Sequence, residues 1–514
     1  MDKNFYITTP IYYPSAKPHM GHAYSSIIAD FFARFKKIDG FNVYFLTGTD
    51  EHGLKIQRAA EKKGVKPLQF CDEISETFRN LSKTLNLTNT DFIRTTEKRH
   101  KISVQNLWNV LEKNDDIYLS KYSGWYSVSD EAFYSDEEVD ELDGIKIANA
   151  SKSTVEWMDE ESYFFRLSKW EEKLLHYYEQ NPDFISPKSR RNEVISFVKS
   201  GLKDLSISRK SFSWGIKVPN NNEHIIYVWL DALTNYLSAL NYPNTNDDLF
   251  KNFWPASLHL IGKDILRFHA VYWPAFLLAA KIPLPKKVYG HGWILSGEEK
   301  MSKSKGNILD PIEIIDQYGL DPLRYYLIKE VSFGNDGNIS RDRLEDCINS
   351  DLANNFGNLC QRVIAFTFKN CDGKIPNNIK FNKDDLKILD KFTKNLEIIR
   401  NKIDDQDVNF YIDFIVNSLF EANKYFNDQE PWKKKDDNKR LNTIVYTSLE
   451  IIRKISFMLY PIIPVSSLNA LKIFDINENQ IEFSSITNHL YLKSNEKINK
   501  IDILFQKIEK KNND

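Results

Sequence analysis

The chain has few of the residues that mark several classes of protein. Its 514 residues include only four cysteines, at positions 71, 347, 360 and 371. They are too few and too scattered for a disulfide framework, and no pair has the Cys-x-x-Cys spacing of a zinc knuckle. We therefore expect a protein of a reducing compartment that holds no structural zinc.

Long apolar runs are also missing. The most apolar stretch, Tyr272–Ala280, contains Pro274 and is about half of the ~20 residues that a helix needs to span a bilayer. Residues 1–4 lead straight into the β-prone run Phe5–Thr9, without the apolar core of a signal peptide. We expect a cytoplasmic protein with no membrane partner.

Neither sign of charge dominates, since 69 Lys and Arg face 71 Asp and Glu. A neutral chain can still bind nucleic acid through a local basic face, so this balance does not exclude such a partner. Hydrophobic residues at 42% and charged residues at 27% are ordinary for a globular protein. The length suggests about three domains.

The first fifty residues alternate between strand and helix patterns. Phe5–Thr9 predicts a buried strand, residues 25–37 predict an amphipathic helix, and Asn42–Leu46 predicts a second strand followed by a turn at 47–50. This order predicts a βαβ unit and a parallel sheet. Ligands of such sheets bind beyond the carboxyl ends of the strands, where the loops 10–22 and 47–53 are expected.

The pattern changes twice further along the chain. Residues 116–224 are rich in Tyr, Ser, Glu and Asp and predict an insertion with its own small fold. Strand patterns resume at 225–229 and 258–262, and after about residue 350 the pattern is almost entirely helical. The sequence predicts an α/β protein with a parallel sheet, an insertion and an all-α bundle.

Two short motifs carry chemistry. His19-Met20-Gly21-His22 precedes a predicted helix, where imidazoles and backbone amides suit a phosphate. Lys300-Met301-Ser302-Lys303-Ser304 supplies two ammonium groups on a hydroxyl-rich loop. Together they suit attack on an α-phosphate with loss of pyrophosphate. Each motif alone is weak, but the pair resembles the signatures of class I aminoacyl-tRNA synthetases.

Further segments narrow this resemblance to the methionyl-tRNA synthetase family, over residues 5 to about 435. The segments are Phe5–Pro14, Thr47–Gly53, Asp204–Arg209 followed by Trp214–Ile216, Val228–Leu233 and Gly262–Ile265. The resemblance implies a Rossmann-type catalytic domain in two halves, a connective insertion and a helical anticodon-binding domain. The implied boundaries are 1–115, 116–224, 225–322, a linking segment 323–350, and 351–514.

The resemblance also implies roles for individual residues. Catalysis falls to His19, His22, Lys300 and Lys303, and ATP binding to these four with Gly21, Ser302 and Ser304. A thioether favours aromatic and apolar walls, and the implied methionine-binding residues are Ile11, Tyr13, Asp50, Trp229, Ala232, Tyr236, Asp264 and His269. The implied anticodon-binding residues are Asn358, Arg362 and Trp432, of which the last would stack on a base.

The chain departs from relatives that carry zinc in the insertion. Ser127 and Asp130 stand at a Cys-x-x-Cys spacing, and no cysteine lies between Cys71 and Cys347. The chain therefore resembles the zinc-free subgroup, with ATP and Mg²⁺ as its only cofactors.

The implied reaction forms methionyl-adenylate and passes methionine to the 3′-terminal adenosine of its tRNA, initiator or elongator. DNA is not an expected partner. The appended dimerisation domain of some relatives has no counterpart, so we expect a monomer.

Three alternatives stay open. Another class I synthetase would need a large editing insertion or a zinc-bound thiolate. A small-molecule nucleotidylyltransferase shares the first motif but needs no helical half. An inactive tRNA-binding relative could retain the fold.

Overall fold

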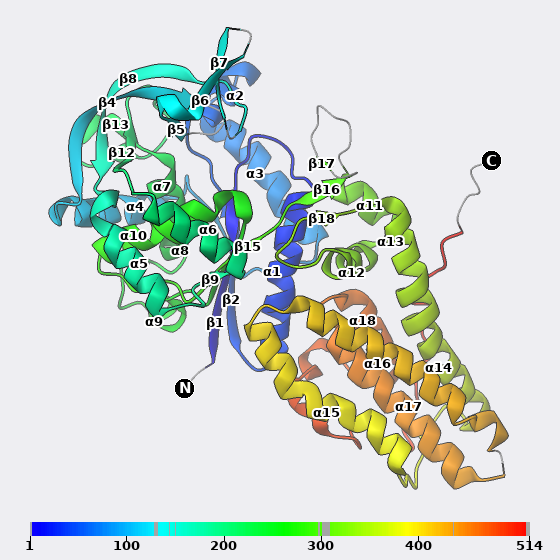
Figure 1. The fold of residues 1–514 in the computed structure, drawn as a ribbon. Helices are drawn as coiled ribbons and strands as arrows, with labels where there is room; N and C mark the ends of the chain where they lie inside the picture. The colour runs from blue at the N-terminus through cyan, green and yellow to red at the C-terminus, as the bar shows by residue number, and fades with distance from the viewer. Residues whose placement is uncertain are drawn as a thin grey trace. The chain divides into compact units, whose positions relative to one another are not determined.

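The computed structural model describes residues 3–127, 132–142, 144–149, 151–296, 299–300, 309–434 and 436–509. The chain divides into two compact units (Figure 1). The sheet unit comprises residues 4–18 and 43–291, and the helical unit comprises residues 1–3, 19–42 and 292–514. Because the chain passes between the units several times, neither unit is one continuous stretch of sequence.

A six-stranded sheet forms the centre of the sheet unit, in the order β3-β2-β1-β14-β15-β9. Its strands are β1 (Asn4–Tyr12), β2 (Asn42–Thr49), β3 (Asp91–Arg94), β9 (Ile185–Ser186), β14 (Leu258–Gly262) and β15 (Val288–His291). The pairs β2–β3, β1–β14, β14–β15 and β15–β9 are parallel. The predicted parallel sheet is confirmed, and β9 joins it from within the range expected for the insertion.

β2 runs further than the sequence predicted. The turn expected at 47–50 is wrong for its first three residues, which continue the strand to Thr49. A Cβ on Gly48 would lie 2.0 Å from the carbonyl oxygen of Ile93 on β3. The glycine permits close approach of a neighbouring strand and does not mark a turn.

Strands that come after β3 in the sequence form smaller sheets. One has the order β10-β8-β4-β5, built on the long antiparallel pair β4 (Ile117–Ser127) and β8 (Glu156–Phe165). The shorter strands are β5 (Ala132–Tyr134), β6 (Val139–Leu142), β7 (Ile145–Ala148), β10 (Leu205–Ser206), β11 (Ser208–Arg209), β12 (Lys217–Val218) and β13 (Asn221–Ile226). β6 pairs with β7, and β13 pairs with β11 and β12.

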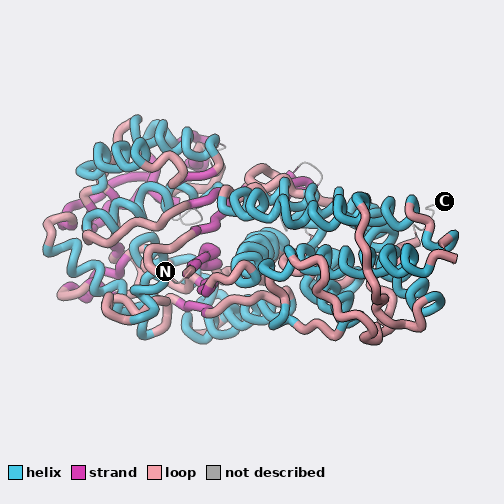
Figure 2. The backbone as a smooth tube through the Cα atoms, turned by 90° about the horizontal axis from the view of Figure 1, so that it is seen from below, coloured by secondary structure: helices cyan, strands magenta, loops and turns pink. Residues whose placement is uncertain are grey.

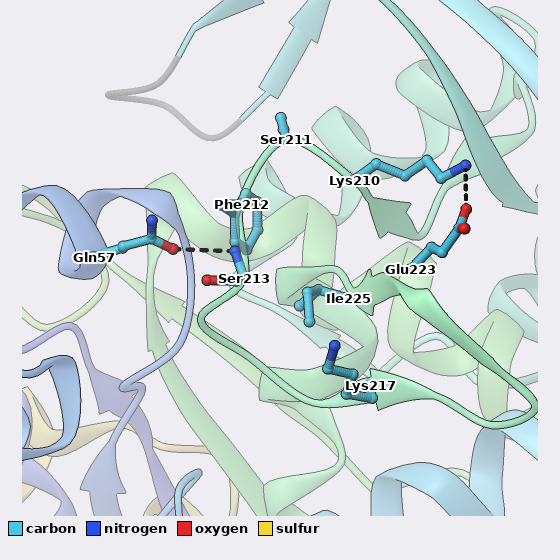
Figure 3. A pocket seen from close by; sticks show the side chains of 8 residues that line it. All are labelled: Gln57, Lys210, Ser211, Phe212, Ser213, Lys217, Glu223 and Ile225. Atoms are coloured by element: carbon cyan, nitrogen blue, oxygen red, sulfur yellow. Dashed lines mark hydrogen bonds and ion pairs between the residues drawn. The ribbon is translucent and has the colours of Figure 1, made fainter.

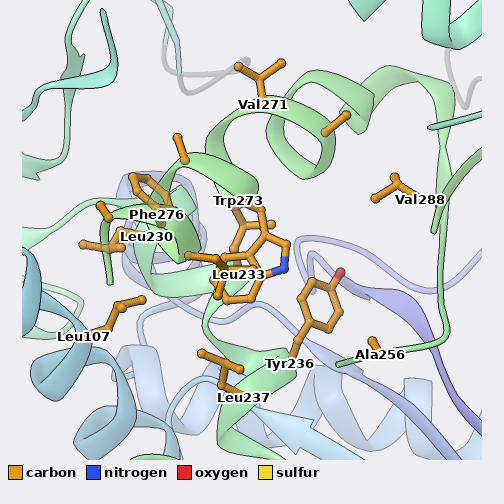
Figure 4. Close-up of a cluster of buried hydrophobic side chains, with 14 of the residues drawn as sticks. Leu107, Leu230, Leu233, Tyr236, Leu237, Ala256, Val271, Trp273, Phe276 and Val288 are labelled. Carbon is orange, nitrogen blue, oxygen red and sulfur yellow. The ribbon is translucent and has the colours of Figure 1, made fainter. Parts of the chain in front are cut away.

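The helices of the sheet unit bury one large apolar core. They are α2 (Leu54–Lys63), α3 (Pro67–Thr84), α4 (Lys98–Lys113), α5 (Glu171–Gln180), α6 (Lys188–Lys199), α7 (Val228–Leu233), α8 (Asn235–Ser238), α9 (Asp248–Phe253) and α10 (Trp273–Ala279). Short helical turns are η1 (Asp136–Glu138), η2 (Leu167–Trp170), η3 (Lys263–Ile265) and η4 (Phe268–Tyr272). In this core the side chains of Leu107, Leu233, Tyr236 and Trp273 gather from four different helices, α4, α7, α8 and α10 (Figure 4).

The strand expected across residues 225–229 is wrong at its end. β13 stops at Ile226, and α7 begins at Val228, so Trp229 lies on a helix. A short apolar run has the same composition in a buried strand and in a buried helix, and its pattern alone does not separate them.

The helical unit contains α1 and the helices after residue 310. They are α1 (Met20–Ile38), α11 (Pro311–Tyr318), α12 (Leu320–Glu330), α13 (Arg341–Cys347), α14 (Asn358–Asn370), α15 (Lys383–Asp404), α16 (Val408–Asp428), α17 (Asn438–Leu459) and α18 (Pro464–Leu471). The π-helical segment η6 (Ile348–Gly357) continues into α14, and η7 (Pro431–Lys433), η8 (Lys472–Phe474), η9 (Glu478–Gln480) and η10 (Phe483–Thr487) are short turns. A small sheet in the order β17-β16-β18 also belongs to this unit. Its strands are β16 (Ile294–Ser296), β17 (Glu299–Lys300) and β18 (Gly337–Asn338).

The long helices of this unit lie side by side, with irregular chain running along them (Figure 2). The described residues after η10 form no helix. They are tied back to the loop after α14, where the amides of Ile375 and Ile498 bond the carbonyls of Glu496 and Gly373. The helical bundle predicted beyond residue 350 is confirmed.

A buried ion network joins α1 to later parts of the helical unit. Asp30 Oδ2 accepts from Arg34 Nε at 2.8 Å and from Arg324 Nη2 at 2.7 Å, and all three side chains are buried. Around it, Phe35 packs edge-on against Tyr411 and Phe483. α1 is therefore part of the core of the helical unit, although it precedes most of that unit by nearly 300 residues.

Candidate functional site

Two histidines of the first motif cap the N-terminus of α1. His19 is the N-cap residue, and its Nδ1 accepts a hydrogen bond from the Gly21 amide at 3.1 Å. Nδ1 of His22 accepts from the His19 amide at 3.0 Å. A Cβ on residue 21 would lie 2.9 Å from Cε1 of His19, so this arrangement requires glycine. With both Nδ1 atoms accepting, each neutral ring carries its proton on Nε2.

The electrostatics of this helix end suit an anion. The two rings lie with their centroids 3.8 Å apart. Burial, and secondarily the proximity of the imidazole of His19, lowers the pKa of His22 well below its ordinary value, so this imidazole is neutral. Neutral N–H donors at the positive end of a long helix can bind phosphate oxygens without releasing a proton.

The second motif lies almost wholly outside the described residues. β17 (Glu299–Lys300) pairs with β16 (Ile294–Ser296), which defines the backbone of Lys300 but not its side chain. Residues 301–308 are outside the described part of the chain. The assignments made from sequence therefore stay predictions for Lys300, Ser302, Lys303 and Ser304.

The loop after β2 is held by hydrogen bonds at successive residues. The Asp50 amide bonds the carbonyl of Tyr12 at 2.9 Å, and the Gly53 amide bonds the carbonyl of Trp214 at 3.2 Å. The Glu51 carboxylate accepts from Arg94 at 2.6 and 3.0 Å and also from three hydroxyl groups, those of Thr49, Ser75 and Thr96. Burial opposes ionisation of Glu51, but these bonds hold its pKa below the ordinary value. Asp50 is thus carried on a fixed backbone.

Next along this loop, His52 belongs to a buried bridge. Its Nδ1 lies 2.7 Å from Oδ2 of Asp231 on α7, and Oδ1 of the same carboxylate lies 2.7 Å from Nε2 of His100 on α4. Nδ1 of His100 lies 3.0 Å from the hydroxyl of Ser238 on α8. Burial alone would raise the pKa of Asp231, but the two imidazoles hold it at about 2. No pattern in the sequence marked this bridge.

An aromatic wall stands on the other side of α7. Trp229 stacks on Phe268 of η4, with ring centroids 3.5 Å apart and planes 12° from parallel. His269 meets the edge of the same indole at 6.5 Å. Phe268 was also missed from the sequence, although it directly precedes His269, which was assigned to the pocket.

Tyr236 and His269 form a directed pair beside this wall. His269 Nδ1 donates to the carbonyl of Ile265 at 3.0 Å, so its Nε2 accepts the hydroxyl of Tyr236 at 2.7 Å. Burial lowers the pKa of His269 to about 4, although the Ile265 bond and the charge of Asp264 act in the opposite direction. The pair therefore holds a neutral imidazole at neutral pH.

The remaining predicted methionine residues also belong to the sheet unit. Tyr13 donates its hydroxyl to the carbonyl of His52 at 3.2 Å. Ile11 packs against the apolar core, and Ala232 is buried on α7. Asp264 lies in η3 directly after β14, and a Cβ on Gly262 would lie 2.6 Å from its Oδ1. All eight predicted methionine-binding residues thus occur in the same unit.

The predicted anticodon residues lie in the helical unit. Asn358 and Arg362 occupy the first turns of α14. Arg362 Nη2 donates to Oδ1 of Asn427 at 2.5 Å, and its guanidinium lies 5.4 Å from the ring of Phe426. Phe426 in turn meets the edge of Trp432 at 6.3 Å, and 41% of Trp432 is exposed. The structure brings Arg362 and Trp432 to one surface through Phe426, which sequence analysis missed.

A separate open pocket of about 320 Å³ lies in the sheet unit (Figure 3). It contains none of the predicted site residues. Lys210, which borders it, forms ion pairs with Glu223 at 2.9 Å and Glu161 at 3.2 Å. The residues around it are Gln57, Lys210, Ser211, Phe212, Ser213, Lys217, Glu223 and Ile225.

No group of three or more His, Cys, Asp or Glu side chains among the described residues is arranged to hold a metal ion. Within the same part of the chain, no helix combines the length and apolarity needed to cross a membrane.

Comparison with known proteins identifies the class and then the family. A family model described as class I tRNA synthetases (M) matches residues 5–143 and 143–364, so the parallel sheet and the His-x-Gly-His helix end are those of a class I tRNA synthetase. The methionine–tRNA ligase of Brucella suis is 49% identical over 486 residues, covering 94% of each chain. That of Rickettsia felis is 49% identical over 516 residues, covering 99% of each chain. The chain belongs to the methionine–tRNA ligase family, and it is an ATP-dependent aminoacyl-tRNA ligase.

Further matches cover the helical unit and the whole fold. A model described as the anticodon binding domain of methionyl tRNA ligase matches residues 375–514. The Mycobacterium tuberculosis methionyl-tRNA synthetase in complex with methionyl-adenylate superposes with a TM-score of 0.95 at 44% identity, covering 98% of this chain and 99% of that one. Its apo form superposes with a TM-score of 0.90 at 40% identity, covering 99% of each chain. These matches exclude two of the alternatives, a class I synthetase for another amino acid and a small-molecule nucleotidylyltransferase.

Proposed function

We propose that the chain binds methionine in the sheet unit, between the Asp50 loop and the wall formed by Trp229 and His269. The observation that carries this proposal is the stack of Trp229 on Phe268 beside the Tyr236–His269 pair. Aromatic faces favour a polarizable thioether, and a neutral imidazole imposes no charge on an apolar side chain. Asp50 takes the substrate's α-ammonium group. Ile11, Tyr13, Ala232 and Asp264 complete the site.

Activation then proceeds without a protein nucleophile. A carboxylate oxygen of methionine attacks the α-phosphorus of ATP, and the bond from that phosphorus to the pyrophosphate oxygen breaks. His19 and His22 donate from Nε2 to phosphate oxygens, while Gly21 leaves room for the nucleotide. Lys300 and Lys303 stabilise the charge that develops on the pyrophosphate, and Ser302 and Ser304 add hydroxyl donors. Mg²⁺ enters with ATP, because phosphate oxygens and waters are the ligands it prefers.

The second step transfers methionine to the 3′-terminal adenosine of tRNA for methionine, initiator and elongator alike. Asn358, Arg362 and Trp432 read the anticodon. Support comes from an exposed indole next to a guanidinium, since unstacked bases bind to aromatic faces and to guanidinium planes.

We also propose a domain organisation, an oligomeric state and a compartment for the chain. Residues 1–115 and 225–322 form the catalytic domain, 116–224 the connective insertion, 323–350 the link and 351–514 the anticodon-binding domain. We propose a cytoplasmic monomer that uses neither DNA nor a membrane. Four free thiols suit a reducing compartment.

The direct test is exchange of labelled pyrophosphate into ATP as a function of amino acid. Methionine should support exchange far better than leucine. Asp50→Ala and Trp229→Ala should each raise the methionine KM, because each removes one side of the site. Trp157→Ala provides the control, since this indole on β8 is 53% exposed and outside the proposed site. A purified chain that shows no methionine-dependent exchange would contradict the proposal and leave an inactive tRNA-binding relative as the alternative.

A further inference from the structure

The buried His52–Asp231–His100 bridge joins two parts of the methionine site that are 179 residues apart in sequence. His52 lies two residues after Asp50, and Asp231 lies between Trp229 and Ala232 on α7. The hydroxyl of Tyr13 also bonds the carbonyl of His52. One carboxylate is thus connected to both halves of the site.

The side-chain bonds of Glu51, the neighbouring residue of the loop, do not reach α7. Glu51 bonds Arg94 on β3 and Ser75 on α3, which fix the loop against those two elements. Neither of these contacts involves α7. The bond from His52 to Asp231 therefore links the loop directly to the helix that carries Trp229.

The second oxygen of the carboxylate has an equally specific partner. His100 on α4 bonds Asp231 directly, and Ser238 on α8 bonds the other ring nitrogen of His100; both side chains are completely buried. On a helix, residues 229 and 231 point to opposite sides. These hydrogen bonds therefore hold α7 on the face opposite Trp229 and the aromatic wall, and they restrict rotation of α7 about its own axis.

We propose that Asp231 is a positioning residue for methionine binding, which sets the separation between the Asp50 loop and Trp229 through its bonds to His52 and His100. This inference rests on the proposed function, because it assumes that methionine lies between these two elements. Asp231 does not touch the substrate. It acts by holding in place beforehand the groups that receive the ammonium group and the thioether, and such preorganisation raises affinity for a ligand.

The test measures KM for methionine and for ATP in pyrophosphate exchange, together with methionine binding by equilibrium dialysis without ATP. Asp231→Ala should raise the methionine KM and Kd on the order of 10-fold, a loss of about 1.4 kcal/mol in binding free energy. The ATP KM should stay within about twofold, because the phosphate-binding motif is on α1 and is not linked to Asp231 by any of these bonds. A variant with lowered kcat and an unchanged methionine KM would overturn the inference.

A second pair of variants covers the case in which Asp231→Ala does not fold. His52→Leu removes only the bond on the loop side, whereas His52→Asn keeps an amide N–H near the position of Nδ1. His52→Leu should raise the methionine KM, and His52→Asn should restore most of the loss. Equal KM values for the two variants would overturn the inference.

The matched control is Asp116→Ala, which removes another buried carboxylate with two N–H partners, Lys169 Nζ at 2.8 Å and Trp170 Nε1 at 3.2 Å. It should lower the melting temperature without changing the methionine KM, so an equal rise in KM would attribute the effect of Asp231 to general destabilisation. The proposed function is judged separately, from exchange by the wild type and from Asp50→Ala. If both behave as expected and Asp231→Ala does not, only this inference fails.

Discussion

The Asp50 loop and the surface around Trp432 are built in opposite ways. The loop is buried, and its residues are bonded to strands and helices on several sides, with one carboxylate meeting four different side chains at Glu51. The Trp432 surface is exposed, with one short hydrogen bond between Arg362 and Asn427 and rings that touch at their edges. One region is fixed before any ligand arrives, and the other is open.

The difference matches the two ligands that we propose for these regions. An amino acid offers few atoms, so a site gains affinity mainly by holding its own groups in place beforehand. An unpaired nucleotide base brings a large flat face, and an exposed ring can use it with little further structure. Changes in the first region should therefore act through geometry, and changes in the second through lost contact area.

The largest effect is expected at Lys303, which belongs to neither region. It tests whether the rate of the chemical step depends on a group outside the two binding regions. Lys303→Ala should reduce the rate of adenylate formation roughly 10²–10³-fold, about 2.7–4 kcal/mol, by analogy with the loss of one donor to a developing charge. Methionine affinity should hardly change, because this charge acts mainly in the transition state. Rapid-quench measurement of adenylate and equilibrium dialysis of methionine separate the two. An unchanged rate with weaker methionine binding would contradict the role of Lys303.

Lowering the pH should reduce the stability of the protein through protonation of His269 in the proposed methionine site. Its folded pKa of about 4 lies below the ~6.5 of an unfolded histidine, so the neutral form stabilises the fold fully above pH ~6.5. That contribution, about 3 kcal/mol, is lost as the pH falls from ~6.5 towards 4. Thermal melts across this range should show a shallower decline for His269→Gln, which keeps an acceptor for Tyr236. Parallel declines in the two proteins would show that His269 does not carry the effect.

The anticodon side should respond to loss of one ring. Trp432→Ala should leave methionine-dependent pyrophosphate exchange intact and reduce tRNA charging about 5- to 150-fold, since stacking on one base contributes ~1–3 kcal/mol. Phe420→Ala is the control, because this ring on α16 is 65% exposed and takes no part in the contacts of Trp432. A lower melting temperature that corresponds to a loss of ~3–5 kcal/mol in unfolding free energy, as for a core truncation, would instead assign Trp432 to packing.

The smallest expected effect is that of metal removal. We predict no stoichiometric zinc in the purified protein and full activity after treatment with a strong chelator once Mg²⁺ is restored, because residues 72–346 contain no cysteine. Elemental analysis and the exchange assay test this together. About one tightly bound zinc per chain would show that other side chains replace the thiolates.

Much of this fold could be predicted from local pattern. The apolar run Phe5–Thr9, the amphipathic helix and the next apolar run gave the parallel sheet, because each signal lies within one element. Gly48 was misread as part of a turn, since the reason for a glycine there is the carbonyl of Ile93, 45 residues away. Trp229 was placed in a strand because α7 is only six residues long and apolar on most positions.

The partners of the site residues could not be predicted in the same way. His52 and His100 meet at Asp231 only when three separate elements have packed together, and no spacing in the sequence marks that meeting. Phe268 and Phe426 are ordinary aromatic residues until a neighbouring ring gives them a role. Motif resemblance identified candidate groups for the chemistry, but not the side chains that orient them.

The position of α1 in the chain has a consequence for synthesis. Asp30 leaves the ribosome 294 residues before Arg324, its buried ionic partner, and Phe35 precedes Phe483 by a still longer interval. At a translation speed of about 5–20 residues per second, Asp30 waits roughly 15–60 s for that arginine. During this time the nascent chain carries a helix, nearly all of whose residues are buried in the folded protein, without its final neighbours. A chain released before residue 324 would keep that helix permanently without them, which makes early termination products of this protein ready substrates for chaperones and proteases.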